Sequence, residues 1–413
     1  MIETEIFGTL PNGLLAHAYT LIEKNTRVTI SDFGATILSI KTPDVRGDVQ
    51  DIVLGFDTLA DYAGANPACY GATIGPVANR SDKAEIVLEG VAYTLPKNDG
   101  PSQENNLHTS LTEGLHKRLW KAEVDHEHNT VTLSCTLLDG EFGLPGDRNF
   151  SARFELVSRD GGGSDNLAGV TCLAGASTCG NADSITDLDG GCQQLRVTYI
   201  CTTSKPTFVN MTNHSYFNLA GHASGSVLDH EVCIHASSYL PIRKDNVSEG
   251  TVEPVKNTPF DFREAKALGE NIHNENEQLR RANGYDHCFA VDGYTSPDAS
   301  DVAGVAHTAA AETAEKTNQP RSALLARDPK SGRRLHITIS APGAHLYTGN
   351  WLNDTSAKDC ASYAQRAGFA FEPEFYPDCS HHQSWPQPLC TPEHPYIATI
   401  VYTFSHDSHV LQL

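Results

Sequence analysis

Short runs of alternating apolar and polar residues recur along this chain, and residues that favour turns separate them. Val, Ile, Thr, Tyr and Phe are frequent in these runs, which is typical of β-strands. Strands are predicted within residues 27–43, 51–56, 84–95, 129–138, 149–158, 195–204, 206–219, 333–341, 344–352 and 396–404. Helical spacing of apolar residues is rare, and Asn271–Ala282 is the best candidate for a helix. The pattern therefore predicts an all-β fold, a sandwich or a barrel, with few short helices and no internal repeat.

Two stretches interrupt this pattern. Residues 159–194 are rich in Gly, Asp, Ser and Ala, and residues 292–320 are small, polar and acidic. Neither has enough large apolar residues to order itself in a core, and both fall between predicted strands. Because the entropy cost of closing a loop grows slowly with its length, we expect two exposed, mobile surface insertions rather than linkers. The whole chain, residues 1–413, is then expected to form a single domain.

One apolar stretch near the C-terminus carries two acidic residues. It reads GFAFEPEFYPD over residues 368–378, with Glu372 and Glu374 two positions apart. On a β-strand, residues i and i+2 point to the same face. Two carboxylates on one buried face destabilise a fold unless they are paired or have a chemical role. On a surface loop they would need no explanation, so the rest of the chain must decide.

The net charge of −21 limits the kinds of partner. Asp and Glu number 51 against 30 Lys and Arg, so neither nucleic acid nor an anionic membrane surface is an expected partner. No run approaches the ~20 apolar residues of a membrane span, and the N-terminal residues lack the pattern of a signal peptide. We therefore expect a cytoplasmic protein whose 11 cysteines are reduced thiols. Cys172, Cys179 and Cys192 come nearest to a cluster, but they lack the spacing of a metal site.

Several polar side chains lie inside or beside the β-like runs. His214 stands in TNHSYFNLAG, His108 in NNLHTS, Asn79 and Arg80 in GPVANR, and Asp286 in NGYDHCF. Taken singly, each has a plain structural explanation, such as a core histidine bonded to the backbone, a turn, a solvated arginine or a capping aspartate. Taken together with a glutamate, they form a set that can line a polar pocket in a β-scaffold.

These motifs, in this order, resemble the aldose 1-epimerase (galactose mutarotase) family. The matching segments are GATIGPVANR, NNLH, DGEFGLPGD, TNHSYFNLAG, NTPFDFR, GYDHCF, SGRRLHI, LYTGNWL and FEPEFYPD, which together span nearly the whole chain outside the two insertions. The resemblance implies a large single-domain β-sandwich of the galactose mutarotase type. It also implies interconversion of the α and β anomers of a free aldohexose, such as galactose or glucose, without a cofactor or a metal.

The resemblance also implies two catalytic residues. Glu372 occupies the position of the general base, and His214 that of the acid that protonates the ring oxygen. The residue types suit the reaction, because mutarotation removes the proton of the anomeric hydroxyl and delivers one to the ring oxygen. The ring opens to an aldehyde, the C1–C2 bond rotates, and closure gives the other anomer. One group must be deprotonated and the other protonated, so a bell-shaped pH profile is expected.

The remaining residues of the implied site bind the sugar. His108 would bond near the ring oxygen or an adjacent hydroxyl, and the other residues would hold hydroxyls or line the pocket; they are Asn79, Arg80, Tyr216, Asp286 and His345.

The chain also departs from the family pattern. His345 and Glu374 stand where members often carry glutamine, Pro76 stands where they carry arginine, and Thr109 and Ser110 follow His108 where they carry two glycines. A second carboxylate beside Glu372 is expected to raise the pKa of one of the two, because like charges disfavour double ionisation. The departures affect the expected substrate preference and pH optimum more than the reaction.

Three other functions remain open on the sequence. A glycoside hydrolase would use Glu372 with Glu374 or Asp286, although two residues of one strand do not naturally flank a scissile bond. A hexose-phosphate epimerase would need a cationic clamp, and Arg80 is the only strong cation in the motifs that carry the candidate site residues. A non-catalytic carbohydrate-binding protein would need the pocket but not the acid and base. The expected partner is in each case a small-molecule sugar, and the protein is expected to be a monomer or a homodimer.

Overall fold

The structure is a computed structural model that describes residues 1–64, 66–159, 192–295 and 319–407. Within these ranges it contains 28 β-strands and two short α-helices, α1 (Leu59–Ala63) and α2 (Glu277–Ala282). The predicted all-β fold is therefore confirmed. None of the helices in the described ranges is long and apolar enough to cross a membrane.

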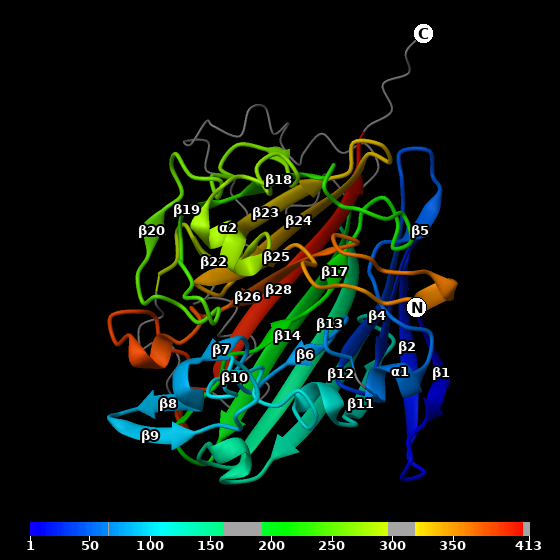
Figure 1. Cartoon of the computed structure of the whole chain (residues 1–413). Coiled ribbons are helices and arrows are strands. Elements are labelled where there is room, and N and C mark those ends of the chain that lie inside the picture. The colour runs from blue at the N-terminus through cyan, green and yellow to red at the C-terminus, as the bar shows by residue number, and fades with distance from the viewer. Residues whose placement is uncertain (65, 160–191, 296–318, 408–413) are drawn as a thin grey trace.

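Three larger antiparallel sheets make up most of the fold (Figure 1). The nine-stranded sheet has the order β11 (Lys121–Asp125), β12 (Thr130–Leu137), β13 (Arg148–Arg159), β14 (Cys192–Thr203), β28 (Tyr396–His406), β24 (Arg333–Ile339), β23 (Arg321–Arg327), β18 (Glu231–Ile234) and β21 (Lys266–Ala267). The six-stranded sheet has the order β17 (Tyr216–Phe217), β26 (Phe369–Glu374), β25 (Gly343–Tyr347), β22 (Asp286–Val291), β19 (Ala236–Tyr239) and β20 (Glu253–Pro254). The five-stranded sheet runs in chain order through β1 (Ile2–Thr9), β2 (Leu15–Glu23), β3 (Thr26–Ser31), β4 (Thr36–Pro43) and β5 (Val49–Asp51).

Four two-stranded pairs complete the described strands. They are β7 (Arg80–Ser81) with β10 (Asn106–Leu107), β6 (Thr73–Ile74) with β16 (Thr212–Asn213), β15 (Thr207–Phe208) with β27 (Leu389–Cys390), and the hairpin of β8 (Glu85–Leu88) and β9 (Val91–Thr94). The first two pairs matter for function, because they carry polar residues towards the six-stranded sheet.

The main hydrophobic core takes buried residues from all three larger sheets. Phe217 of β17 lies with its ring centre 5.6 Å from that of Tyr402 on β28, so the six-stranded and nine-stranded sheets pack against each other. Phe369 and Phe371 of β26 belong to the same core. Since successive side chains of a strand alternate between faces, the residues between and after them point to the opposite face of the sheet.

Several predicted strands are shorter or more broken than expected; β25, for example, ends at Tyr347, although the strand was predicted over residues 344–352. Of residues 51–56, only Asp51 lies in a strand, at the end of β5. Residues 206–219 form three strands of two residues each, β15, β16 and β17, instead of one. In this stretch side-chain amides bond to the backbone of other segments: Asn213 donates to Gly71, and Asn218 donates to Gly225 and Ala367. These bonds replace a regular ladder and tie the segment to the loops around it.

The predicted helix at Asn271–Ala282 is also shorter than expected, because it begins only at Glu277. The side chain of Asn276 accepts hydrogen bonds from the backbone amides of Gln278 and Leu279 and so caps the helix N-terminus. The preceding residues of the predicted helix form turns instead.

The two predicted insertions fall mostly outside the described residues, which omit 160–191 and 296–318. Their predicted exposure and mobility stay predictions. Arg159 and Cys192 are register partners at the ends of β13 and β14, so the two ends of the first predicted insertion belong to the sheet itself.

The cysteines agree only in part with the prediction of reduced thiols. Eight described cysteines are free. Cys233 on β18 is disulfide-bonded, so the prediction is wrong at that residue, since pairing cannot be deduced from cysteine spacing. Cys192 is a free, buried thiol, and Cys172 and Cys179 lie outside the described residues.

Candidate active site

Strand β26 answers the question raised by its two carboxylates. Glu372 and Glu374 lie on the face opposite to Phe369 and Phe371, and they are only 3% and 0% exposed. The predicted shared, buried face is therefore confirmed. In the register of β26 with β25, Glu372 lies directly opposite His345. This strand pair forms the floor of the candidate site.

His214 lies between β16 and β17 and reaches Glu372. Its backbone is held on both sides, since its amide donates to the carbonyl of Ala72 and its carbonyl accepts from the amide of Gly71. The imidazole stacks on the ring of Tyr216, with ring centres 5.0 Å apart, and its Nε2 lies 3.5 Å from Oε1 of Glu372. The two predicted catalytic residues, 158 positions apart in sequence, are thus brought together in a buried pair.

His108 completes the wall beside His214, with ring centres 5.4 Å apart. Its backbone has a positive φ of 56°, which turns the chain sharply after β10. The backbone amide of Asn79 donates to Nδ1 of His108 over 3.1 Å. Because a backbone amide can only donate, Nδ1 must accept, and in the neutral ring the hydrogen sits on Nε2. His108 therefore presents a fixed N–H donor.

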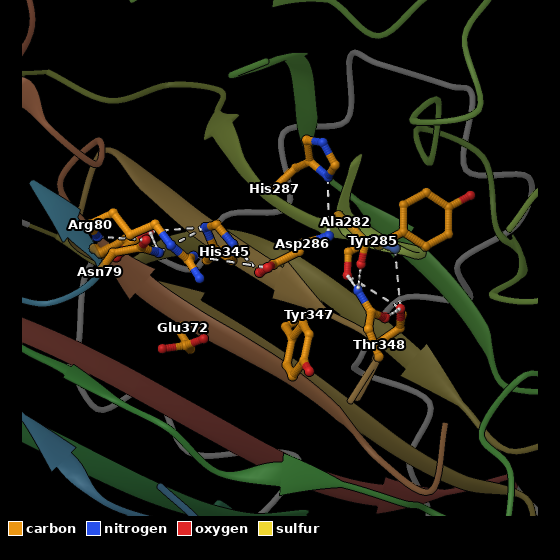
Figure 2. Close-up of polar contacts among 12 residues, drawn as sticks. Asn79, Arg80, Ala282, Tyr285, Asp286, His287, His345, Tyr347, Thr348 and Glu372 are labelled. Carbon is orange, nitrogen blue, oxygen red and sulfur yellow. Dashed lines mark hydrogen bonds and ion pairs between the residues drawn. The ribbon is translucent and has the colours of Figure 1, made fainter. Parts of the chain in front are cut away.

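A chain of ionic and hydrogen-bonded contacts lies beside Glu372. Nε2 of His345 is 2.8 Å from Oδ1 of Asp286, and its Nδ1 is 3.3 Å from Oε1 of Glu374. The side-chain nitrogen of Asn79 donates to the same oxygen of Glu374 over 3.1 Å. Figure 2 shows Asn79 joined to His345, and His345 and Arg80 joined to Asp286, while no dashed line connects Glu372 to the other residues drawn.

Arg80 connects this chain to a residue that the sequence did not single out. Its Nε donates to Oδ2 of Asp99 over 2.9 Å, and its Nη1 lies 3.9 Å from Oδ2 of Asp286. Asp99 forms an isolated β-bridge with Asn105 and belongs to no recognisable motif, so nothing in the sequence marked it. Tyr347 was also missed, although it follows His345 by two residues and its ring centre lies 5.9 Å from that of Tyr216.

Two departures from the family pattern find a structural role. Both ring nitrogens of His345 face protein groups, so this residue helps to hold the site together, and its predicted contact with the sugar stays a prediction. Oγ1 of Thr109 accepts from the amide of Val77 and donates to its carbonyl, so this side chain ties the loop after His108 to the loop before Asn79.

The electrostatics of the catalytic pair are set by burial. Burial raises the pKa of Glu372 well above its usual range; the positive ring of His345 opposes this shift and the charge of Glu374 adds to it. Burial lowers the pKa of His214 to about 3. In the free protein the proton that this pair shares therefore resides mainly on Glu372, which is the reverse of the roles assigned to the two residues.

Three polar atoms of the site are left open. Oε2 of Glu372, Oε2 of Glu374 and Nδ1 of His214 are buried without a hydrogen-bond partner within the described residues. Buried polar groups are normally bonded, so an unbonded group calls for a ligand or a chemical role. The unbonded atoms on Glu372 and His214 mark the place where a polar molecule would bind.

A metal ion is the first ligand to consider. Ligand atoms of His108, His214 and Glu372 lie within 4.8 Å of one another. A histidine binds a metal through a nitrogen that carries no hydrogen, but Nδ1 of His108 is occupied by the Asn79 amide and Nε2 bears the hydrogen of the neutral ring. The donor set therefore fits a metal poorly and fits a hydroxyl-bearing molecule well.

Comparison with known proteins decides the family. The sequence profile described as "Aldose 1-epimerase" matches residues 17–161 and 185–403. The chain belongs to the aldose 1-epimerase family. The resemblance found in its motifs is thereby confirmed.

Curated members of the aldose 1-epimerase family match along nearly the whole chain. Galactose mutarotase from Bos taurus is 33% identical over 402 residues, which is 97% of each protein. Aldose 1-epimerase from Escherichia coli (strain K12) is 31% identical over 370 residues, covering 88% of this chain and 87% of that protein.

Solved structures support the fold. The aldose epimerase homologue from C. elegans, 25% identical, superposes with a TM-score of 0.71 over 94% of this chain and 98% of that one. Galactose 1-epimerase from Lactobacillus acidophilus NCFM, 23% identical, gives a TM-score of 0.72 over 99% of both chains. The fold of the galactose mutarotase type, predicted from the motifs, is thus confirmed.

Proposed function

We propose that this chain is an aldose 1-epimerase, an isomerase that interconverts the anomers of a free aldohexose. Membership of the family over most of the chain supports this function. The observation in the site that carries it is the buried Glu372–His214 pair, with an open oxygen on one member and an open nitrogen on the other. This arrangement can accept a proton at one point of a bound sugar and deliver one at another.

In the proposed reaction the form of the pair that reacts carries the shared proton on His214 and an ionised Glu372, so Glu372 takes the proton of the anomeric hydroxyl and His214 gives its proton to the ring oxygen. The bond between C1 and the ring oxygen breaks, and the aldehyde forms as the C1–O1 bond becomes double. After rotation about C1–C2 the aldehyde is attacked from its other face, the ring oxygen returns its proton to His214, and Glu372 returns its proton to O1. The N–H of His108 stabilises charge at the ring oxygen or at a neighbouring hydroxyl.

The pair works with one shared proton, and this determines the pH profile. Gain of a second proton inactivates the pair as pH falls through the lowered pKa of His214, about 3. Loss of the shared proton inactivates it as pH rises through the raised pKa of Glu372. The rising limb of the bell therefore belongs to His214 and the falling limb to Glu372, because burial has inverted the usual order of the two groups.

Sugar hydroxyls are assigned to Asn79, Arg80 and Asp286, with Tyr216 lining the same site. Burial disfavours the charged form of Asp286, but the contact with His345 and the charge of Arg80 outweigh it and lower the pKa to about 2. Asp286 therefore remains ionised and accepts hydrogen bonds from hydroxyls. An ionised Asp286 is also unsuited to be the general acid of a glycoside hydrolase, which needs a raised pKa.

Galactose and glucose are both proposed substrates, and no cofactor is proposed. Arg80 is engaged by Asp99 and Asp286, which argues against a clamp for a sugar phosphate. A location in the cytoplasm, a single domain and a monomer or homodimer remain predictions from the sequence.

Polarimetry on freshly dissolved α-galactose and α-glucose tests the proposal. We expect the protein to accelerate the approach to the equilibrium rotation of both sugars, with no release of reducing sugar from an aryl glycoside. An unchanged rate with either sugar, together with measurable sugar binding, would indicate a carbohydrate-binding protein instead.

A further inference from the structure

His345 occupies an unusual position, buried between two carboxylates. It is 4% exposed, and its Nε2 and Nδ1 lie 2.8 Å from Asp286 and 3.3 Å from Glu374. Glu374 is fully buried, and its second oxygen has no partner within the described part of the chain. A buried carboxylate requires a nearby positive charge or strong donors. Nδ1 of His345 and the side-chain nitrogen of Asn79 both face the same oxygen of Glu374, at 3.3 and 3.1 Å, and these two nitrogens lie 3.0 Å apart.

Within the described ranges, no other cation is well placed to take over this role. Arg80 is shared between Asp99 and Asp286. Four other titratable groups act on this cluster. Two come from β22, namely His287 and the Cys288 thiol, which interacts with the His345 ring, and the other two are the rings of His108 and His214. Burial keeps the Cys288 thiol uncharged, because it raises the pKa of that thiol to about 12. Burial likewise keeps the rings of His108, His214 and His287 uncharged, because it lowers their pKa values. A charged His345 is therefore the balancing group for Glu374.

The strand register places the charges of His345 and Glu374 beside Glu372, the proposed general base. His345 lies directly opposite Glu372 across β25 and β26, and Glu374 lies two residues further along the same face. Side chains in these positions are close enough to interact. A positive His345 favours the ionised form of Glu372, and a negative Glu374 favours its protonated form. The two charges thus act on Glu372 in opposite directions.

We propose that His345 and Glu374 form a mutually dependent buried ion pair that positions Asp286 and sets the alkaline limit of the activity by balancing the charge around Glu372. His345 is in this view a positioning residue. The catalytic part of the inference rests on the proposed function, whereas the ion pair itself does not.

The state of the imidazole follows from its neighbours. Burial alone would lower the pKa of His345, but the hydrogen bond with Asp286 and the carboxylate of Glu374, 3.3 Å from Nδ1, raise it well above its usual range. Burial raises the pKa of Glu374, and the bond to His345 acts against this shift. Each member therefore favours the charged form of the other.

The test compares the wild type with Glu374→Gln, with His345→Gln and with the double variant, by polarimetry across pH. In Glu374→Gln, Asp286 still holds the imidazolium of His345, but the negative charge that raises the pKa of Glu372 is gone. The falling limb should therefore move to lower pH by about 1 unit, as expected for directly coupled groups. In His345→Gln the positive charge opposite Glu372 is lost while Asp286 stays beside Arg80, so the same limb should move to higher pH. In the double variant both charges are gone, and the limb should return to within about 0.3 unit of the wild type.

His336→Gln serves as a matched control. This residue is also a buried histidine on a strand, but its Nε2 meets the hydroxyl of Ser322 and no carboxylate. We expect its falling limb to coincide with that of the wild type. Shifts of the two single variants in the same direction, or a double variant displaced by as much as either single one, would overturn the proposal.

A second measurement separates this inference from the proposed function. The imidazole signals of His345, assigned by their loss in His345→Gln, should show in NMR a charged ring throughout the neutral range, and Glu374→Gln should lower its titration midpoint. This NMR titration does not depend on whether the protein is an active epimerase. A ring that titrates near 6.5, the ordinary midpoint, would overturn the ion pair even if the enzyme is active. An inactive protein with a charged His345 would overturn the proposed function alone.

Discussion

Two buried acid–base pairs in this molecule, Lys358–Asp51 and His214–Glu372, differ in how completely their polar atoms are hydrogen-bonded. Lys358 and Asp51 meet at 2.9 Å, and they lie among saturated partners. The ammonium also donates to the carbonyls of Leu38 and Val53, and the second oxygen of Asp51 accepts from the amides of Ile40 and Val53. This pair joins the segment after β25 to the five-stranded sheet, and nothing remains free for a ligand.

Glu372 and His214 are buried to a similar degree but lie 3.5 Å apart, each with an unbonded polar atom. An unsatisfied buried group destabilises the fold, so it persists where it has a chemical role. The comparison shows that burial of charged residues does not by itself identify a catalytic site. What distinguishes the catalytic candidate is the hydrogen-bonding capacity that the protein leaves unused.

The largest effect on activity is expected from Glu372→Gln. Loss of the general base should lower kcat by about 10²- to 10⁴-fold in polarimetry. The neutral amide is easier to bury than the carboxylate, so the melting temperature should not fall. Asp51→Asn is the matched variant in the saturated pair and should destabilise the protein. Turnover near that of the wild type in Glu372→Gln would remove this residue from the mechanism.

His214→Ala is expected to have the next largest effect, chiefly on kcat, because proton transfer to the ring oxygen changes most between ground and transition state. Without His214 the base acts only when Glu372 is ionised. Since the pKa of Glu372 is raised, activity should rise with pH in the region where the wild type declines, and no falling limb should remain.

The His214 prediction is measured as kcat against pH, with His214→Gln as a variant of more similar size. A falling limb that survives in His214→Ala but disappears in His108→Ala would show that the acid is His108.

A smaller loss is expected from His108→Ala. The fixed N–H of His108 makes a hydrogen bond that persists in substrate and transition state, so KM should rise and kcat should fall less than in His214→Ala. Initial rates over a range of galactose concentrations separate the two constants. A variant with an unchanged KM would contradict the role of His108 in binding.

The smallest effect on activity is expected from Lys358→Met, which has the largest expected effect on stability. Removing the ammonium leaves Asp51 buried without its charge partner, which typically costs about 3–5 kcal/mol of unfolding free energy. Urea unfolding measures this loss, and kcat at low temperature should remain near that of the wild type.

Lys330→Met is the control for Lys358→Met. Lys330 and Asp229 form an exposed pair at 2.8 Å, and loss of such a pair changes stability by less than about 1 kcal/mol. Equal losses in the two variants would mean that burial does not distinguish these pairs.

Much of the fold was predictable because strand signals are local. The alternation of Phe369, Phe371, Glu372 and Glu374 placed both carboxylates on one face, and β12, β13, β14, β24 and β28 appear close to their predicted bounds. The stretch 206–219 was harder, since its asparagine side chains bond to segments that are distant in sequence. A helix start at Glu277 likewise depended on the single side chain of Asn276.

The residues of the site were determined by the sequence, since the ordered motifs single out Glu372, His214 and His108 and tie them to one family. Tertiary structure alone decided how they are charged. Residues 266 positions apart, Asn79 and His345, meet beside Glu374, and the backbone of Asn79 decides which nitrogen of His108 carries the hydrogen. Protonation depends on burial and on charges that folding brings together from separate strands, and neither quantity is written in any local stretch of the chain.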